Sequence, residues 1–391
     1  MQGLGANEKA ILNRIPILFL RKIATKIVLV KMRMQFTGWL QYFLPIIFVL
    51  LLSLIGGIML LFKASFLAKP LFILATLIFM VAMFDVVTSK FRLRFPERLP
   101  KRNDTLALFD LMRVRRSCRS FQTRKLTDAD YNELMESVRV HTEESQIGQS
   151  PVRFEYISAP LTVWPTVNAS EFLVAIVPKE YDRLAVIDVG RSLQKIVMDA
   201  ARMGLGTCWI GPGADHGSIV QNLGDRFDSG KDQIICVCAV GYKSTYYIPI
   251  FLRIFNAQFK RRLPLAELFF ADADFKQPLD VDAAPFNRFG RNYEICQWAP
   301  SSYNGQTTRC VATVAESGEL KSFDFYTATA SRYYAPVALG IWYANWEMGC
   351  EALGIRGHFA LLSAEQRDVS DEKVLPELPR YDVSWVVDEN F

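Results

Sequence analysis

The sequence predicts an α+β protein in which a hairpin of two membrane-spanning helices precedes a larger globular part. Residues 41–62 contain no charged side chain, and residues 70–88 contain only one, Asp85. Beyond residue 102, apolar segments of strand length alternate with longer segments whose apolar positions recur at helical spacing. The 391 residues exceed one average domain, and 51% of them are hydrophobic, which suits a sizeable core together with a membranous part.

The two apolar runs predict a transmembrane hairpin over residues 41–90. Each run approaches the ~20 residues that an α-helix needs to cross the hydrocarbon core. The linker from Lys63 to Lys69 is short, so the two helices should lie side by side. The alternative is a buried core hairpin in a soluble protein, and the uncharged run length and the flanking bases disfavour it.

The charge distribution supports a membrane and argues against nucleic acid as a partner. Residues 1–102 hold 15 Lys or Arg and 3 Asp or Glu, so the overall net charge of +5 hides an acidic remainder. Seven Lys or Arg precede Gln41 and six lie between Lys90 and Arg102. Because positive flanks stay on the cytoplasmic side, we expect an integral membrane protein whose globular part faces the cytoplasm.

Residues 1–40 predict a basic, amphipathic segment on the membrane surface. Between residues 10 and 33, apolar side chains such as Ile15 and Phe19 alternate with Arg14, Arg21 and other basic groups. Such a pattern is typical of a helix that lies on an anionic bilayer rather than crossing it. We expect no cleavable secretory signal, because charge interrupts the first apolar run.

The globular part predicts a layered arrangement of strands and long helices. Thr127, with Asp130 three residues later, resembles a helix-capping pair. Gly204 and Gly206 end an apolar-periodic helix, so we interpret them as a helix C-terminal turn and not as a dinucleotide-binding fingerprint. The expected elements are a helix ending near Val140, a strand at 172–177, a helix at 188–203, a buried strand at 235–242 and a helix at 336–352.

The spacing of the cysteines and histidines argues against several enzyme classes. The seven cysteines form no C-x-x-C pair, so a zinc site is not expected. Cys236 and Cys238 are two apart in an apolar strand, which predicts two small buried groups on one face. The three histidines fit no nucleophile-elbow or metal-binding pattern, which disfavours hydrolases and zinc proteases.

Two polar motifs carry the functional prediction. The stretch RRSCRSF, residues 115–121, supplies guanidinium groups that can bind phosphate oxygens, with a hydroxyl among them. The stretch APSSYNGQ, residues 299–306, supplies turn formers and short polar groups that let backbone approach a flat heterocycle. Alone, the first would be typical of a solvated basic face and the second of an ordinary turn.

Together with GLGTCWIG (204–211), ICVCAVGY (235–242) and KRRLPLAEL (260–268), these motifs occur in an order that resembles the nitroreductase family. The resemblance implies a nitroreductase-like layered fold with bound FMN. It also implies that the phosphate and ribityl chain meet the basic residues, that a glycine-proline segment lines the ring, and that the polar loop approaches it. The residues implied as cofactor-binding are Arg115, Arg116, Ser117, Arg119, Gly211, Pro212, Gly213, Lys260, Arg262, Pro300, Ser301, Ser302 and Asn304.

A faint internal duplication divides the globular part into residues 91–270 and 271–391. In family members of ordinary length the polar loop follows the arginine motif closely, but here residues 141–154 hold a degenerate version of it. The second copy keeps the loop and has Arg288, Gly290 and Arg291 in place of a complete clamp. The resemblance therefore implies a fused, monomeric pseudo-dimer with one FMN site between its halves and a lost mirror-related site.

The family's activity implies a membrane-anchored oxidoreductase that takes hydride from NADH or NADPH through flavin N5, in ping-pong fashion. The acceptor would be a nitroaromatic, a quinone or a similar small molecule, and no side chain need act as a nucleophile or proton donor. Two alternatives remain open. One is a membrane-tethered module that kept the fold and lost flavin, and the other is a specialised flavoenzyme for dehalogenation or ring oxidation.

Overall fold

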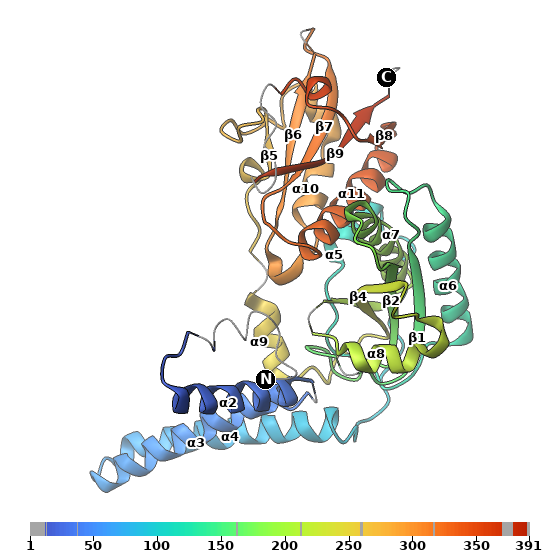
Figure 1. Cartoon of the computed structure of the whole chain (residues 1–391). Coiled ribbons are helices and arrows are strands. Elements are labelled where there is room, and N and C mark those ends of the chain that lie inside the picture. The colour runs from blue at the N-terminus through green and yellow to red at the C-terminus, as the bar shows by residue number, and fades with distance from the viewer. Residues whose placement is uncertain are drawn as a thin grey trace.

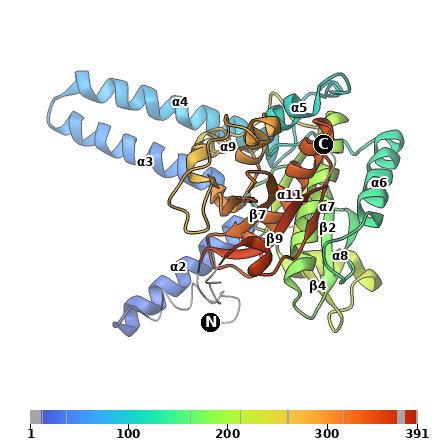
Figure 2. The same cartoon turned by 90° about the horizontal axis from the view of Figure 1, so that it is seen from above.

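The computed structural model describes residues 12, 14–36, 38–161, 163–211, 213–258, 261–315, 317–369 and 378–388. The chain forms a group of N-terminal helices and two sheet-containing units that stand to one side of them (Figure 1). A view from above shows the helical hairpin extending beyond the edge of the sheet-containing units (Figure 2). This division matches the predicted α+β architecture with two apolar helices at its front.

The apolar helices are α3 (Leu40–Leu61) and α4 (Ser65–Ser89), which pack against each other. By length and composition both could cross a membrane, with mean hydropathies of 2.8 for Tyr42–Leu61 and 2.4 for Ser65–Ser89. The turn between them is shorter than the predicted 63–69 linker, because the second helix already begins at Ser65. The amphipathic segment is helical as α2 (Leu18–Phe36), which contacts α3.

The first sheet contains four antiparallel strands in the order β1-β2-β4-β3. Its helix α7 (Arg183–Arg202) buries most of its side chains, whereas α6 (Asp128–Glu143) and α8 (His216–Leu223) are more exposed. Residues Gly224–Arg226 form a short 3-10 turn after α8. The strands are β1 (Arg153–Ser158), β2 (Glu171–Pro178), β3 (Gly206–Ile210) and β4 (Asp232–Gly241).

The second sheet has the order β5-β6-β7-β9-β8, and its last four strands repeat the arrangement of the first sheet. In each case a helix, α7 or α11 (Tyr334–Ala352), joins the second strand to the third. The strands are β5 (Phe269–Phe270), β6 (Thr308–Val314), β7 (Leu320–Thr327), β8 (Gly357–Ala360) and β9 (Arg380–Val387). Short helical segments are α10 (Asn292–Gln297), Leu265–Glu267, Phe286–Phe289, Ser302–Asn304 and Glu365–Arg367.

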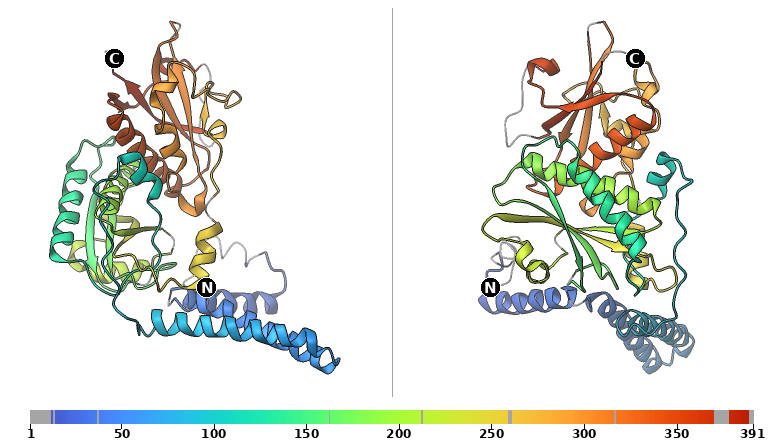
Figure 3. Two further views of the ribbon diagram at one scale, coloured as in Figure 1. Left: turned by 180° about the vertical axis from the view of Figure 1, so that it is seen from behind. Right: turned by 90° about the vertical axis from the view of Figure 1, so that its right-hand side faces the viewer.

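The two long helices cross closely at the centre of the globular part (Figure 3). Two glycines permit the approach, because a Cβ at Gly190 would lie 2.3 Å from the carbonyl oxygen of Val337. A Cβ at Gly340 would lie 1.9 Å from the carbonyl oxygen of Ile187. The predicted helices at 188–203 and 336–352 are thus confirmed as a packed central pair.

Smaller expectations are also confirmed. Thr127 Oγ1 accepts a hydrogen bond from the Asp130 N–H at 3.2 Å, as expected for a cap. Gly204 follows α7 with a φ of +84°, as a helix C-terminal turn requires. Cys236 and Cys238 are both buried in the same core cluster beneath β4.

The segment after β4 leaves the first sheet and contacts first the helical hairpin and then the second sheet. Helix α9 (Ile250–Gln258) packs on α3 and α4, and lies between the hairpin and the second sheet in Figure 1. Further on, Phe269 pairs with Cys310 of β6 in parallel and stacks on Trp342 at 5.4 Å. The end of the predicted first half, 91–270, is therefore built into the core of the second.

Candidate functional site

The basic motif begins where helix α5 (Leu108–Val114) ends, and its backbone is fixed to the edge strand β3. The N–H of Cys118 donates to the Thr207 carbonyl at 2.8 Å, and Ser117 forms an isolated bridge with Thr207. Gly206 allows this contact, because a Cβ there would lie 2.7 Å from Cys118 Sγ. We call residues 115–121 the clamp loop.

Arg115 is the most buried charge of the clamp loop. Its side chain belongs to a residue only 7% exposed, and its Nη1 has no hydrogen-bond partner among the described residues. Burial first, and then the positive charges of Arg116 and Arg262, lower the pKa of Arg115 to about 10. A buried cation beside other cations is unfavourable unless an anion joins it. The arrangement therefore has the chemistry of an anion site.

Arg262 brings a second, partly buried guanidinium to the same place from the segment that leads to β5. Its Nη1 donates to Asn304 Oδ1 at 2.7 Å and to the Ala299 carbonyl at 3.1 Å. Its Nε has no hydrogen-bond partner in the described part of the chain. Burial and then the charge of Arg116 lower the pKa of Arg262 to about 10.

Trp298 separates two of these cations. The guanidinium of Arg116 lies 4.8 Å from the centroid of the Trp298 ring, and that of Arg262 lies 5.4 Å from it. Such contacts attract a cation to the ring face and limit its rotation. Trp298 thus holds one arginine from each of two distant segments against the end of α10.

The polar loop, residues 299–306, is held in an unusual backbone shape. Tyr303, Asn304 and Gln306 have φ values of 51°, 55° and 46°, a region that non-glycine residues rarely adopt. The segment preceding β5 imposes this shape, because Asn304 Nδ2 donates to the Arg261 carbonyl at 2.7 Å. The Leu263 N–H donates to Gln306 Oε1 at 2.8 Å. The loop and the arginine segment therefore form one unit, and strain of this kind is typical of ligand sites.

The predicted site residues fall into distinct positions. The charges of Arg116 and Arg262 lower the pKa of Arg115, and the charge of Arg116 lowers that of Arg262. Asn304 is hydrogen-bonded to Arg262. The charge of Arg119 acts on the thiols of Cys118 and Cys208, which places it on the β3 side of the clamp loop. Lys260 and Pro212 lie outside the described residues.

The remaining predicted residues have mainly backbone functions in this structure. Ser301 Oγ accepts from the Gln306 N–H at 3.0 Å, and the Ser302 carbonyl accepts from the Gly305 N–H at 3.0 Å. Pro300 lies immediately before this turn. Ser117 contributes the bridge to β3 described above.

Gly211 and Gly213 follow β3 and lie against two different neighbours. A Cβ at Gly213 would lie 1.9 Å from the Trp164 carbonyl oxygen, so this glycine is required for packing. A Cβ at Gly211 would lie 3.2 Å from Cε1 of Tyr334, the first residue of α11. This end of β3 therefore faces the beginning of a helix from the second half.

The sequence did not predict Trp298 and Lys243 as site residues. Burial first, with Arg115 opposing its charge, lowers the pKa of Lys243, so this lysine adds to the positive site. Both residues adjoin motifs that the sequence singled out, since Lys243 follows the strand 235–242 and Trp298 precedes the polar loop. Their position next to these motifs was the sequence signal that could have identified them as site residues.

At the degenerate loop of the first half, residues 141–154, acidic side chains neutralise the cations. The degenerate loop supplies Glu144, which accepts from Lys195 Nζ at 2.5 Å and from His141. Glu347 of α11 pairs with Arg191 at 2.6 Å and with Lys195 at 2.9 Å. This place is occupied by a connected network of ion pairs across α7 and α11.

The degenerate clamp of the second half is also neutralised. Arg291 lies 2.9 Å from Asp110 and 3.5 Å from Glu294, and its side chain is 41% exposed. The hydrogen bond to Asp110 raises the pKa of Arg291. Among the described residues, no carboxylate forms an ion pair with Arg115, so this place has the better chemistry for an anion.

Comparison with known proteins identifies the family of this chain. A family model described as "Putative TM nitroreductase" matches residues 107–349, which span both central helices and most of the site. No curated protein sequence matches the chain.

Several solved structures are similar to the chain. A nitroreductase of Thermotoga maritima is 14% identical, with a TM-score of 0.45, and the match covers 75% of this chain and 99% of that one. A nitroreductase of Bacteroides fragilis with bound FMN is 14% identical, with a TM-score of 0.30, covering 36% and 89%. An FMN-dependent nitroreductase of Clostridium difficile is 18% identical, with a TM-score of 0.29, covering 34% and 87%. Since the family model alone matches more than half of the residues, this chain belongs to the nitroreductase family.

Proposed function

We propose that the protein is a membrane-anchored, FMN-dependent oxidoreductase that uses NADH or NADPH to reduce a small organic acceptor. The single observation that carries the proposal is the buried Arg115, which lies near Arg116 and Arg262 and has an unpartnered Nη1. A phosphate monoester supplies the charge and the acceptor oxygens that this group of cations requires. FMN ends in such a phosphate.

The chain's own residues would bind and orient the cofactor. Arg115 and Arg262 would donate to the phosphate through the Nη1 and Nε atoms that lack partners. Trp298 and Asn304 would keep Arg262 in place, as their present contacts do. Bound FMN would supply the hydride chemistry, accepting from a reduced nicotinamide and delivering to the acceptor.

Contacts between the clamp loop and the apolar hairpin support a role at the membrane surface. Ser120 Oγ donates to the Tyr247 carbonyl at 2.8 Å, and the Tyr247 ring stacks on Phe84 of α4 at 6.1 Å. The N–H of Ile250, the first residue of α9, donates to Asp85 of α4 at 2.8 Å. The site is thus tied to one end of the hairpin, which favours a lipid-soluble acceptor such as a quinone over a nitroaromatic in water.

The proposal includes one FMN per chain, a monomeric globular part and a cytoplasmic orientation. The repeated strand order supports a fused pseudo-dimer, as does β5, which the end of the first half contributes to the second sheet. The mirror-related place has its cations paired with Glu144 and Glu347. The bases that flank the hairpin support the orientation.

The first test is flavin content. Full-length protein purified in detergent should be yellow, with about one FMN per chain by absorbance. Arg115→Ala should lose the flavin, whereas Arg113→Ala should retain it, because Arg113 is exposed and pairs with Glu294. Wild-type protein that is colourless and takes up no added FMN would contradict the proposed enzymatic function.

The second test concerns the two substrates. Anaerobic mixing with NADH or NADPH should bleach the flavin, and addition of an acceptor should restore the colour. The proposal expects faster recovery with a quinone in the same micelle or bilayer than with a water-soluble nitroaromatic. Faster recovery with the nitroaromatic would keep the flavoenzyme but reject the lipid-soluble acceptor.

A further inference from the structure

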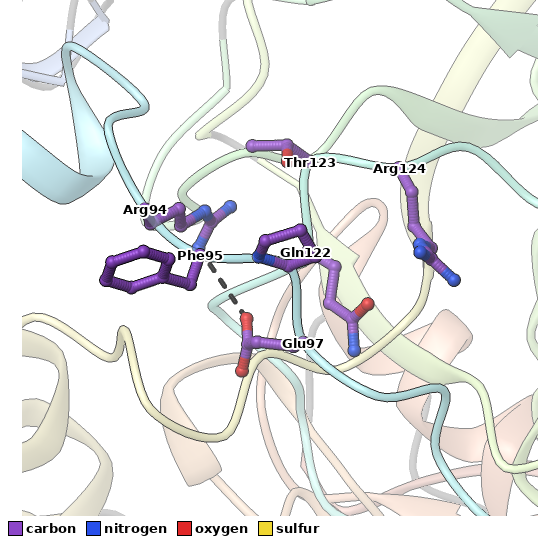
Figure 4. A pocket seen from close by; sticks show the side chains of 7 residues that line it. Arg94, Phe95, Glu97, Gln122, Thr123 and Arg124 are labelled. Atoms are coloured by element: carbon purple, nitrogen blue, oxygen red, sulfur yellow. Dashed lines mark ion pairs between the residues drawn. The ribbon is translucent and has the colours of Figure 1, made fainter.

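A cavity of about 220 Å³ lies where the globular part meets the hairpin (Figure 4). Two segments line it, residues 94–97 shortly after α4 and residues 122–124 directly after the clamp loop. In the view of Figure 4, Arg94 and Arg124 lie on opposite sides, with Glu97 and Gln122 between them. Neither segment is among the residues expected to bind the flavin.

The cavity adjoins the end of an apolar helix. The Leu93 N–H donates to the Val87 carbonyl at 3.2 Å, which folds the segment back onto α4. The side-chain amide of Asn168, in the orientation that satisfies its neighbours, connects the Ser89 carbonyl with Arg94 Nη2. Basic side chains that flank an apolar helix are typical of the headgroup region, and Lys90, Arg92 and Arg94 directly follow α4. The cavity therefore lies at the level of lipid headgroups.

Two residues that line this cavity, a cation and an anion, each have one buried side-chain atom without a hydrogen-bond partner among the described residues. The Arg94 side chain is 3% exposed, and its Nη2 donates to the Phe121 carbonyl at 2.9 Å, but its Nη1 has no hydrogen bond among the described residues. The Glu97 side chain is 5% exposed, and its Oε2 accepts from the backbone of residues 245 and 246. Its Oε1 has no hydrogen bond in the same part of the chain.

These two atoms cannot satisfy each other. Arg94 Nη1 and Glu97 Oε1 are 3.9 Å apart, which is too long for a hydrogen bond. Leaving a buried donor and a buried acceptor unsatisfied is costly, so a ligand that offers both a negative oxygen and an N–H would stabilise the cavity. Burial also lowers the pKa of Arg94, with Glu97 opposing, which an added anion would offset.

We propose that this cavity binds the headgroup of a phospholipid that carries a primary ammonium, as in phosphatidylethanolamine. The phosphodiester would accept from Arg94 Nη1, with Arg124 contributing charge from the other side. The ammonium would donate to Glu97 Oε1. Phosphatidylcholine has no N–H to donate, and phosphatidylglycerol carries a hydroxyl in place of the ammonium, so both should bind less well.

The bound lipid would connect the hairpin to the flavin-binding region. Arg94 Nη2 already holds the last residue of the clamp loop, Phe121. Gln122, the next residue, donates to the Arg98 carbonyl at 2.9 Å and to the Lys243 carbonyl at 3.1 Å. A headgroup between these segments would brace them against each other.

The test uses full-length protein in nanodiscs of phosphatidylcholine containing a minor share of either phosphatidylethanolamine or phosphatidylglycerol. After gentle release into detergent, native mass spectrometry counts the lipids retained by each chain. Wild-type protein should retain about one phosphatidylethanolamine. Arg94→Ala and Glu97→Gln should reduce retention about tenfold, and Arg92→Ala should not, because Arg92 is an exposed neighbour that does not line the cavity.

Further arms separate the remaining outcomes. Soluble phosphoethanolamine that displaces the lipid at micromolar concentration would reassign the cavity to a free metabolite with the same chemistry. Equal retention of all three lipids would overturn the role of the ammonium, and no retention by the wild type would mean that the cavity holds water only. If Arg94→Ala does not fold, Arg124→Ala, at an exposed position, provides a second variant in which lipid retention should fall. None of these readouts requires bound flavin.

Discussion

The two arginine-bearing loops of this molecule began with similar chemistry and differ in their surroundings. Arg115 is buried, lies near two other arginines and has a lowered pKa. Arg291 is partly exposed, pairs with Asp110 and Glu294, and has a raised pKa. An arginine motif therefore becomes an anion site where the fold buries it and keeps carboxylates away. Where carboxylates are at hand, the same residue type becomes an ordinary surface ion pair.

The polar loops show the same contrast. Residues 299–306 hydrogen-bond to the arginine segment through Asn304 and Gln306, and they bring no acid to it. The corresponding loop of the first half brings Glu144, which joins Lys195 and Glu347 in a closed network. One place is open to a charged ligand, and the other has satisfied its charges internally.

The largest expected effect comes from removing both buried arginines. Arg115→Ala with Arg262→Ala should weaken FMN binding about 10³-fold, because each charge-assisted hydrogen bond contributes about 1.5–3 kcal/mol. The matched double variant, Arg288→Ala with Arg291→Ala, should leave the affinity unchanged. Isothermal titration of flavin-free protein measures both. Equal losses in the two double variants would contradict the assignment of a single site.

Next in size is the loss of a carboxylate from the mirror-related network. Glu347→Gln should reduce the free energy of unfolding by about 3 kcal/mol, because Arg191 and Lys195 would remain buried without their shared partner. Glu351→Gln, on the exposed side of the same helix, should have little effect. Urea unfolding in detergent measures the difference. A folded Glu347→Gln variant that binds a second FMN would show that the network alone had closed the mirror-related site.

The pH dependence of stability should be smaller and should depend on His141. Burial opposes its charge, but the hydrogen bonds that the protonated ring donates to Asp199 and Glu144 outweigh burial and raise the pKa of His141 to about 9. Because the folded pKa exceeds the unfolded value, this stabilisation is complete below pH ~6.5 and is lost as the pH rises through 9. The shift corresponds to about 3 kcal/mol, which solvent screening around the partly exposed carboxylates reduces to about 2 kcal/mol. Unfolding of wild type and His141→Gln across pH 6–10 should converge at the alkaline end. Parallel curves would reject the role of the histidine.

The smallest effect is expected at the second arginine loop. Asp110→Asn removes one partner of Arg291 at the surface, and exposed pairs contribute about 0.5 kcal/mol or less. Thermal unfolding and flavin content should therefore match the wild type. A marked loss of flavin in this variant would mean that Arg291 acts on the occupied site after all.

The sequence predicted those features that depend on local periodicity and capping. The hairpin, the central helices, the Thr127 cap and the turn at Gly204 all follow from patterns within about 20 neighbouring residues. The family order of motifs also brought Arg115, Arg262 and Asn304 into one hypothesis before their contacts were known. Helix α9 was not predicted, because its nine residues are short for a periodicity argument.

Features that depend on distant partners could not be predicted. Nothing local to Glu347 indicates that it meets Lys195, since the two residues lie on different helices. Lys243 gains its importance only because β4 ends beside the clamp loop. Likewise, chain order assigns residues 269 and 270 to the first half, but their strand, β5, pairs with the second sheet.

The covalent connection through Arg262 and β5 has a consequence for how the molecule responds to dilution. Two separate subunits must find each other at the prevailing concentration, whereas here the linker fixes the local concentration of one half around the other. Flavin affinity should accordingly be the same at nanomolar and micromolar protein. The same linkage lets each copy accumulate its own substitutions, since a change in one half is never imposed on its counterpart.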